Sequence, residues 1–163
     1  MDDLMLCIDG SVNPQSQIGY GAYLAVSERS PGLDLLRTQV KVRRFEHTSS
    51  TKLELQTLLW ALGEIQAMGR KVTVYTDSQN ILGLPARRDG LEKNGFRTRK
   101  NNRLKHDELY RAFYRVMDQL DCELIKVRGH QVSKQKDDMD RLFTLVDRAS
   151  RKALREEGGQ RDH

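Results

Sequence analysis

The first part of the chain has the hydrophobic patterns of β-strands. Met5 to Ile8 form a short apolar run that ends at the turn residues Asp9 to Ser11, and a second strand is predicted over Ile18 to Val26, where apolar residues recur with period two. A hairpin turn at Pro31-Gly32 precedes a third, half-exposed strand over residues 35–45. This third strand is expected to run antiparallel to the second.

The period then changes to that of a helix. Apolar residues at helical spacing predict a helix over residues 52–68, ended by Gly69. Val72 to Tyr75 are mostly apolar, which is typical of a central parallel strand. A short helix reaches about Leu84, where Pro85 is expected to stop it.

The remaining pattern predicts a helix over 105–120, a strand over 124–127 and a last helix over 140–156. The order β-β-β-α-β-α-α-β-α indicates an α/β fold. We expect a five-stranded mixed sheet whose first three strands are antiparallel, with helices on both faces. Residues 1–157 are expected to form one domain, and residues 158–163 a disordered tail.

The positive charge is concentrated in one segment. The net charge of the 163 residues is +5, yet residues 87–105 alone hold eight basic and two acidic residues. This density indicates a site for a nucleic-acid backbone, although a solvated loop is the simpler alternative. Two cysteines give no disulfide framework, and no apolar run could span a membrane, so a monomeric cytoplasmic or nuclear protein is expected.

Four acidic residues stand where they could carry chemistry. Asp9 and Asp77 follow apolar strands, and if those strands are parallel neighbours, both acids emerge at one edge of the sheet. Glu54 lies in the first turn of a helix and Asp147 on the last helix. Each also has an ordinary explanation: a turn residue for Asp9 or Asp77, a capping box over Thr51 to Glu54, and a surface position for Asp147.

The combination of these acids favours a metal site. Carboxylates that converge repel one another without a cation, and oxygen ligands select Mg²⁺ or Mn²⁺. Two such ions can activate water and stabilise the leaving oxygen of a phosphodiester. His130, in a loop after the fifth strand, could move protons there, although most loop histidines have no such role.

With these residues in place, the chain resembles the type 1 ribonuclease H family over residues 4–155. The resemblance rests on five short motifs in the family's order: Ile8-Asp9-Gly10-Ser11 with Gly19-Tyr20-Gly21-Ala22, Lys52-Leu53-Glu54-Leu55, Tyr75-Thr76-Asp77-Ser78-Gln79, Val127-Arg128-Gly129-His130, and Val146-Asp147-Arg148-Ala149.

The resemblance implies a metal-dependent endoribonuclease that cuts the RNA strand of RNA–DNA hybrids, leaving 3′-hydroxyl and 5′-phosphate ends. It implies Asp9, Glu54, Asp77 and Asp147 as ligands of two Mg²⁺ ions, which Mn²⁺ can replace, and His130 as a mobile catalytic histidine. The residues expected to contact the substrate are Ser11, Asn13, Ser49, Gln79, Lys93, Phe96, Arg97, Arg99, Lys100, Lys105 and Tyr110. Phe96 and Tyr110 are expected to stack on sugars.

The sequence also departs from the family pattern. The segment from His130 to Asp147 is long, Ser50 and Thr51 replace two common asparagines, and His106 replaces another. Three alternatives remain open: another nuclease or strand-transfer enzyme on the same fold, a non-catalytic nucleic-acid-binding module, and a basic α/β domain with neither activity.

Overall fold

The computed structural model describes residues 3–27, 32–127 and 138–160. Its five-stranded sheet has the order β3-β2-β1-β4-β5. The strands are β1 (Leu4–Asn13), β2 (Ile18–Val26), β3 (Lys41–Phe45), β4 (Lys71–Thr76) and β5 (Asp121–Lys126). β1, β2 and β3 pair antiparallel, whereas β4 pairs parallel with both β1 and β5. The predicted mixed sheet is therefore confirmed.

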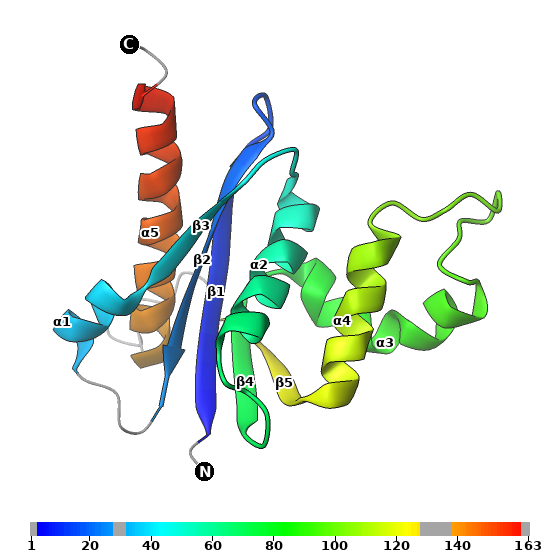
Figure 1. Cartoon of the computed structure of the whole chain (residues 1–163), viewed down its shortest axis with the longest axis horizontal. Coiled ribbons are helices and arrows are strands. Elements are labelled where there is room, and N and C mark those ends of the chain that lie inside the picture. The colour runs from blue at the N-terminus through cyan, green and yellow to red at the C-terminus, as the bar shows by residue number, and fades with distance from the viewer. Residues whose placement is uncertain (1–2, 28–31, 128–137, 161–163) are drawn as a thin grey trace.

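Helices cover both faces of this sheet (Figure 1). One face carries α2 (Ser50–Glu64), α3 (Gln79–Lys93) and α4 (Asp107–Gln119), and the other carries α5 (Asp138–Gln160). β1 contributes side chains to the core on both faces of the sheet, because successive strand residues point to opposite faces. Leu6 and Ile8 are buried in the core beneath α2 and α4, whereas Cys7 is buried beneath α5 with Val146.

The third strand is shorter than predicted. Only Lys41–Phe45 is a strand, and it follows the short helix α1 (Leu33–Leu36) and the 3-10 turn η1 (Arg37–Gln39). Leu36 is buried in the core beneath α5, while Leu35 is 60% exposed. The alternating pattern could not distinguish a strand from one helical turn that buries Leu36.

The predicted boundaries of two helices were also wrong. α2 ends at Glu64, because Ile65 adopts an extended backbone, and not at Gly69. α3 continues through Pro85 to Lys93. Packing on both sides of the proline holds α3 together: Ile81 and Leu84 before it and Leu91 after it contact the same core, which offsets the local cost of about 3 kcal/mol.

The C-terminal helix is longer than predicted at both ends. α5 begins at Asp138 and reaches Gln160, so it includes the first three residues of the segment expected to be a tail. The last three residues of that segment lie outside the described part of the chain. Across the described residues, no helix combines the length and apolar character needed to cross a membrane.

Candidate active site

Asp9 and Asp77 lie at the same level of the sheet. Parallel pairing of β1 with β4 ends at Cys7 and Tyr75, and each aspartate lies two residues beyond. The sequence predicted that Asp9 ends a strand. This was wrong, because β1 continues to Asn13 through its pairing with β2. The free edge that exposes Asp9 is therefore created by the end of β4.

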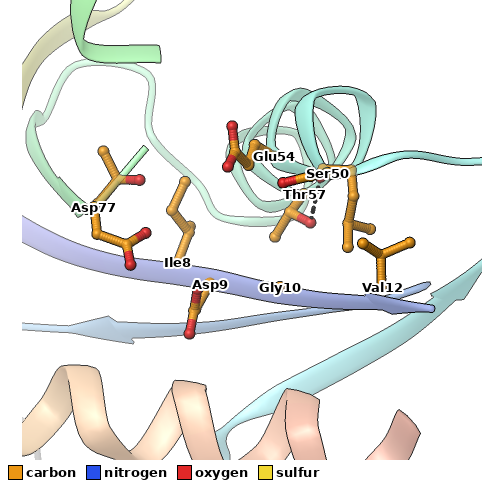
Figure 2. A pocket seen from close by; sticks show the side chains of 10 residues that line it. Ile8, Asp9, Gly10, Val12, Ser50, Glu54, Thr57 and Asp77 are labelled. Atoms are coloured by element: carbon orange, nitrogen blue, oxygen red, sulfur yellow. Dashed lines mark hydrogen bonds between the residues drawn. The ribbon is translucent and has the colours of Figure 1, made fainter. Parts of the chain in front are cut away.

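The side chain of Asp9 points toward α5. Alternation along β1 places it on the same face as Cys7, and Figure 2 shows its carboxyl group directed toward that helix. The fourth acid, Asp147, lies on α5, and its carboxyl group is near enough to that of Asp9 to raise the pKa of Asp9. The two faces of the sheet thus contribute different acids.

Glu54 approaches from the opposite face on α2 (Figure 2). Ser49 caps this helix by accepting from the Lys52 backbone N–H at 3.3 Å, so the capping box predicted for Thr51 and Glu54 is not formed. Glu54 instead accepts a hydrogen bond from the Ser78 hydroxyl, with 2.6 Å between the oxygens. The Glu54 carboxylate is thereby held beside the end of β4.

Two glycines let α2 pack closely enough to bring Glu54 into place. A Cβ atom on Gly21 would lie 2.2 Å from the Thr57 hydroxyl oxygen. A Cβ atom on Gly10 would lie 2.9 Å from the Leu53 side chain. Both distances are too short for real contacts, so the motif glycines of β1 and β2 are required by the position of the helix.

Burial and the neighbouring acids raise the pKa of two carboxyl groups of the site. Burial, followed by the hydrogen bond with Asp147, raises the pKa of Asp9 to about 8, and the nearby charges of Asp77 and Asp147 act in the same direction. Burial also raises the pKa of Glu54. Asp9 and Glu54 thus resist losing their protons, as expected for carboxyl groups at a place where a cation binds.

Asp147 is held by its own helix. Arg151, one turn further on, places its Nε atom 3.0 Å from the Asp147 carboxylate. The hydroxyl groups of Ser11 on β1 and Ser150 on α5 lie 3.1 Å apart. This contact fixes the helix against β1 next to Asp147.

Asp9, Glu54 and Asp77 line a pocket of about 40 Å³ between β1, α2 and the end of β4. The donor set consists of carboxylate oxygens, which fits Mg²⁺ or Mn²⁺ and does not fit softer metals. Within the described ranges, no three acidic, histidine or cysteine side chains are arranged to hold a metal ion. The fit to such an ion therefore rests on the oxygen chemistry of Asp9, Glu54 and Asp77 and on the pocket that they share.

A sequence model of the RNase H family matches residues 1–147. The chain belongs to the RNase H family. Three bacterial proteins named ribonuclease H are similar to it. The protein of Lachnoclostridium phytofermentans is 28% identical over 82% of this chain and 84% of its own length. That of Syntrophomonas wolfei is 24% identical over 87% and 94%, and that of Novosphingobium aromaticivorans is 29% identical over 60% and 68%.

A structural comparison supports the same fold. A foamy viral protease-reverse transcriptase in complex with double-stranded DNA superposes with a TM-score of 0.62. The match covers 91% of this chain and 93% of that one, at 11% sequence identity. Membership of the RNase H family makes the chain a relative of nucleases.

Several residues expected to contact substrate in an RNase H lie near the acids. Ser11 lies on β1, Ser49 caps α2 and Gln79 opens α3 directly after Asp77 and Ser78. Asn13 ends β1, where its side-chain oxygen accepts from the Gln15 N–H at 2.9 Å. Their placement near the edge is compatible with backbone contacts to a nucleic acid.

Phe96 and Tyr110 are not available to stack on sugars. Both side chains are buried in the core beneath α2 and α4, at 5% and 6% exposure. The Phe96 ring packs near Tyr114 and under the Arg111 guanidinium, whose central carbon lies 4.3 Å from the ring centroid. The two aromatic rings thus anchor the segment between α3 and α4 to the core.

The basic segment keeps only part of its charge free. Arg88 pairs with Asp118 at 2.6 Å, and Arg103 pairs with Asp107 at 2.8 Å. From Lys93, the last residue of α3, to the start of α4, the chain also exposes Lys93, Arg97, Arg99, Lys100 and Lys105, of which Arg97 donates to the Asn101 carbonyl oxygen at 3.1 Å. The charge count of the sequence could not show that two of the arginines are used within the protein.

His130 lies outside the described residues, between β5 and α5. Sequence reasoning missed Ser78, which both caps α3 through the Ile81 N–H at 3.1 Å and donates to Glu54. The hydroxyl directly after Asp77 was visible in the sequence as a helix-start signal. Only the fold shows that the same hydroxyl reaches the acid on α2.

Proposed function

We propose that this protein is an endoribonuclease that hydrolyses the RNA strand of RNA–DNA hybrids. The observation that carries the proposal is that Asp9, Glu54 and Asp77 line one pocket of an RNase H fold, with Asp147 near Asp9 on the other face of the sheet. No single acid would distinguish a nuclease from a protein with a charged turn. Phosphodiester hydrolysis by metal ions needs grouped oxygen ligands, and the shared pocket of three acids supports the proposal in that respect.

The four acids would hold two Mg²⁺ ions, or Mn²⁺ in their place, which when bound activate a water molecule and stabilise the leaving oxygen. Ser78 orients Glu54, and Arg151 keeps Asp147 in place. We assign His130 the transfer of a proton to or from the reacting groups. The products are a 3′-hydroxyl on one RNA fragment and a 5′-phosphate on the other.

Discrimination of the hybrid follows from the RNA 2′-hydroxyl. Polar groups around Ser11, Glu54 and Gln79 would meet this hydroxyl group in the minor groove. Ser49 and the basic segment would contact phosphates of the DNA strand, and such contacts fix position without reading bases. Cleavage should therefore depend only weakly on sequence.

We also propose that residues 1–157 act as one monomeric domain in the cytoplasm. The free cysteines Cys7 and Cys122 support a reducing compartment.

The proposal is tested by incubating an end-labelled RNA–DNA hybrid with the protein, with and without Mg²⁺ or Mn²⁺, beside RNA–RNA and DNA–DNA duplexes. We expect metal-dependent cleavage confined to the RNA of the hybrid. Tight binding without cleavage would instead support a non-catalytic binding module, and cleavage of DNA would support another nuclease on this fold.

Asp77→Asn serves as the matched inactive variant. Because Asp77 is exposed at the end of β4, the substitution should leave the fold intact. It should lower the cleavage rate by a factor on the order of 10³ or more, the scale typical of losing a group essential to charge stabilisation. Retained activity with an unchanged thermal midpoint would contradict the assignment of this acid.

A further inference from the structure

A stripe of basic residues lies on the outer side of α5. Residues 148–155 hold four basic and no acidic residues: Arg148, Arg151, Lys152 and Arg155. All four are exposed. We call these residues the α5 stripe. Over the whole helix, basic and acidic residues balance at five each, so a charge count along the sequence hides the stripe.

Helix geometry turns the α5 stripe away from the sheet. Val146 and Ser150 are buried against the sheet, and Arg148 and Lys152 each lie two residues later, about half a turn around the helix. Among the acids, Asp140 is buried and Glu157 accepts from the Tyr20 hydroxyl at 2.9 Å. These two acids are thus used toward the sheet, while the four basic side chains face solvent.

Without a bound ligand, repulsion between like charges of the α5 stripe destabilises the helix. Arg148 and Lys152, and likewise Arg151 and Arg155, are like charges at i, i+4 spacing, which destabilises a helix by a few tenths of a kcal/mol for each pair. Arg151 pairs with Asp147, and Lys152 lies 4.0 Å from Glu156. Within the described part of the chain, Arg148 and Arg155 have no ion-pair partner. A polyanion would relieve this repulsion.

The position of the stripe indicates which polyanion. Arg148 directly follows Asp147, and the stripe continues along α5 for about 10 Å at 1.5 Å per residue. Figure 1 shows α5 and the segment between α3 and α4 on opposite sides of the sheet, so basic residues flank the candidate site on both sides. A nucleic acid held at the acids can extend over α5.

We propose that the α5 stripe is a second binding surface for the phosphate backbone of the hybrid, separate from the basic segment between α3 and α4. This inference rests on the proposed function, since the hybrid must occupy the acidic edge to reach the stripe. The stripe would lengthen the contacted stretch of duplex without reading its sequence.

The test compares two triple variants of the full chain with equal change in charge. One is Arg148→Gln, Lys152→Gln and Arg155→Gln. The control is Arg37→Gln, Lys71→Gln and Arg115→Gln, three exposed residues that belong to neither basic region. Binding of a fluorescent RNA–DNA hybrid, long enough to reach both regions, is measured in EDTA over a range of salt concentrations.

We expect the stripe variant to lower the slope of log affinity against log salt by about two to three relative to the control, since each lost phosphate contact removes about 0.9. An Arg148→Lys and Arg155→Lys variant should keep the original slope, because charge is retained. Equal slopes for the stripe and control variants would overturn the inference.

Cleavage of the hybrid by the unaltered protein, measured in parallel, separates the two proposals. Equal slopes beside normal cleavage would reject the stripe alone. A reduced slope in a protein that never cleaves would support the stripe and reject the nuclease.

Discussion

At the scale of the residue, the candidate site is a set of carboxylates that folding brings close together although like charges repel one another. Asp9 is half-buried beside Asp147 and Asp77, and its raised pKa reflects that burial and those neighbours. Glu54 differs because Ser78 donates to it, which favours its charged form and opposes the effect of burial. Two acids of one site are therefore controlled by different contacts.

Asp9→Asn should stabilise the metal-free protein at high pH. The folded protein keeps the Asp9 proton up to about pH 8, whereas the unfolded chain loses it near pH 4. The stability of the unaltered protein should therefore fall as pH rises through this window, and the variant escapes that loss. We expect the gain in free energy of unfolding to exceed about 1 kcal/mol above pH 8, since one pKa unit corresponds to about 1.4 kcal/mol.

Urea unfolding in EDTA at two pH values, one near the bottom and one above this window, measures the effect. Asp118→Asn is the control with the opposite sign, because the ion pair with Arg88 lowers the pKa of Asp118 and its carboxylate stabilises the fold once ionised. A pH-independent difference between Asp9→Asn and the unaltered protein would contradict the prediction.

Ser78→Ala should weaken metal binding as well as stability. The substitution removes the cap of α3 and the hydrogen bond to Glu54, and loss of a cap costs about 1 kcal/mol. Ser49→Ala is the matched control, because it removes the cap of α2 without touching an acid. Calorimetric titration with Mn²⁺ should show weaker binding, by about tenfold, only for Ser78→Ala. Equal affinities would mean that Ser78 is a cap and nothing more.

At the scale of the element, α2 is positioned by how closely it can approach β1 and β2. The side chains that meet the sheet there are Leu53 and Thr57, and glycines lie opposite them. A larger residue at either strand position would move the helix that carries Glu54. The packing of α2 against the sheet therefore also sets the position of Glu54.

Gly21→Ala should destabilise the protein by about 1–3 kcal/mol, the usual cost of overpacking, because its Cβ would lie 2.2 Å from the Thr57 hydroxyl oxygen. Gly63→Ala, on α2 itself, meets no atom within 4 Å. It should stabilise by up to about 1 kcal/mol, since alanine favours helix. Thermal unfolding of both variants checks the pair, and a neutral Gly21→Ala would show that α2 can shift freely.

At the scale of the whole molecule, charge is arranged around the acidic edge. The basic segment between α3 and α4 projects from one side of the molecule and α5 lies on the other (Figure 1). Burial of Phe96 and Tyr110 ties the basic segment to the core. A rigid base for exposed cations reduces the entropy lost when they bind a phosphate backbone.

Replacing Arg97, Arg99 and Lys100 by serine should weaken hybrid binding and raise KM. The slope of log affinity against log salt should fall by about two to three, as three phosphate contacts are lost. Because these side chains are exposed, the thermal midpoint should change little. If both KM and the salt slope stayed the same, the segment would be a solvated loop and not a grip on DNA.

The sequence by itself determined the order in which the five strands and the main helices follow one another along the chain, because alternating and helical hydrophobic periods are local properties. It also identified Asp9, Glu54 and Asp77, which line one pocket. Tertiary structure decided the features that depend on distant partners. Packing carried α3 through Pro85, the register of β1 with β4 exposed Asp9, and burial removed Phe96 and Tyr110 from the surface. The exposure of the α5 stripe is also a tertiary feature, since contact with the sheet buries Val146 and Ser150 and leaves the four basic side chains toward solvent.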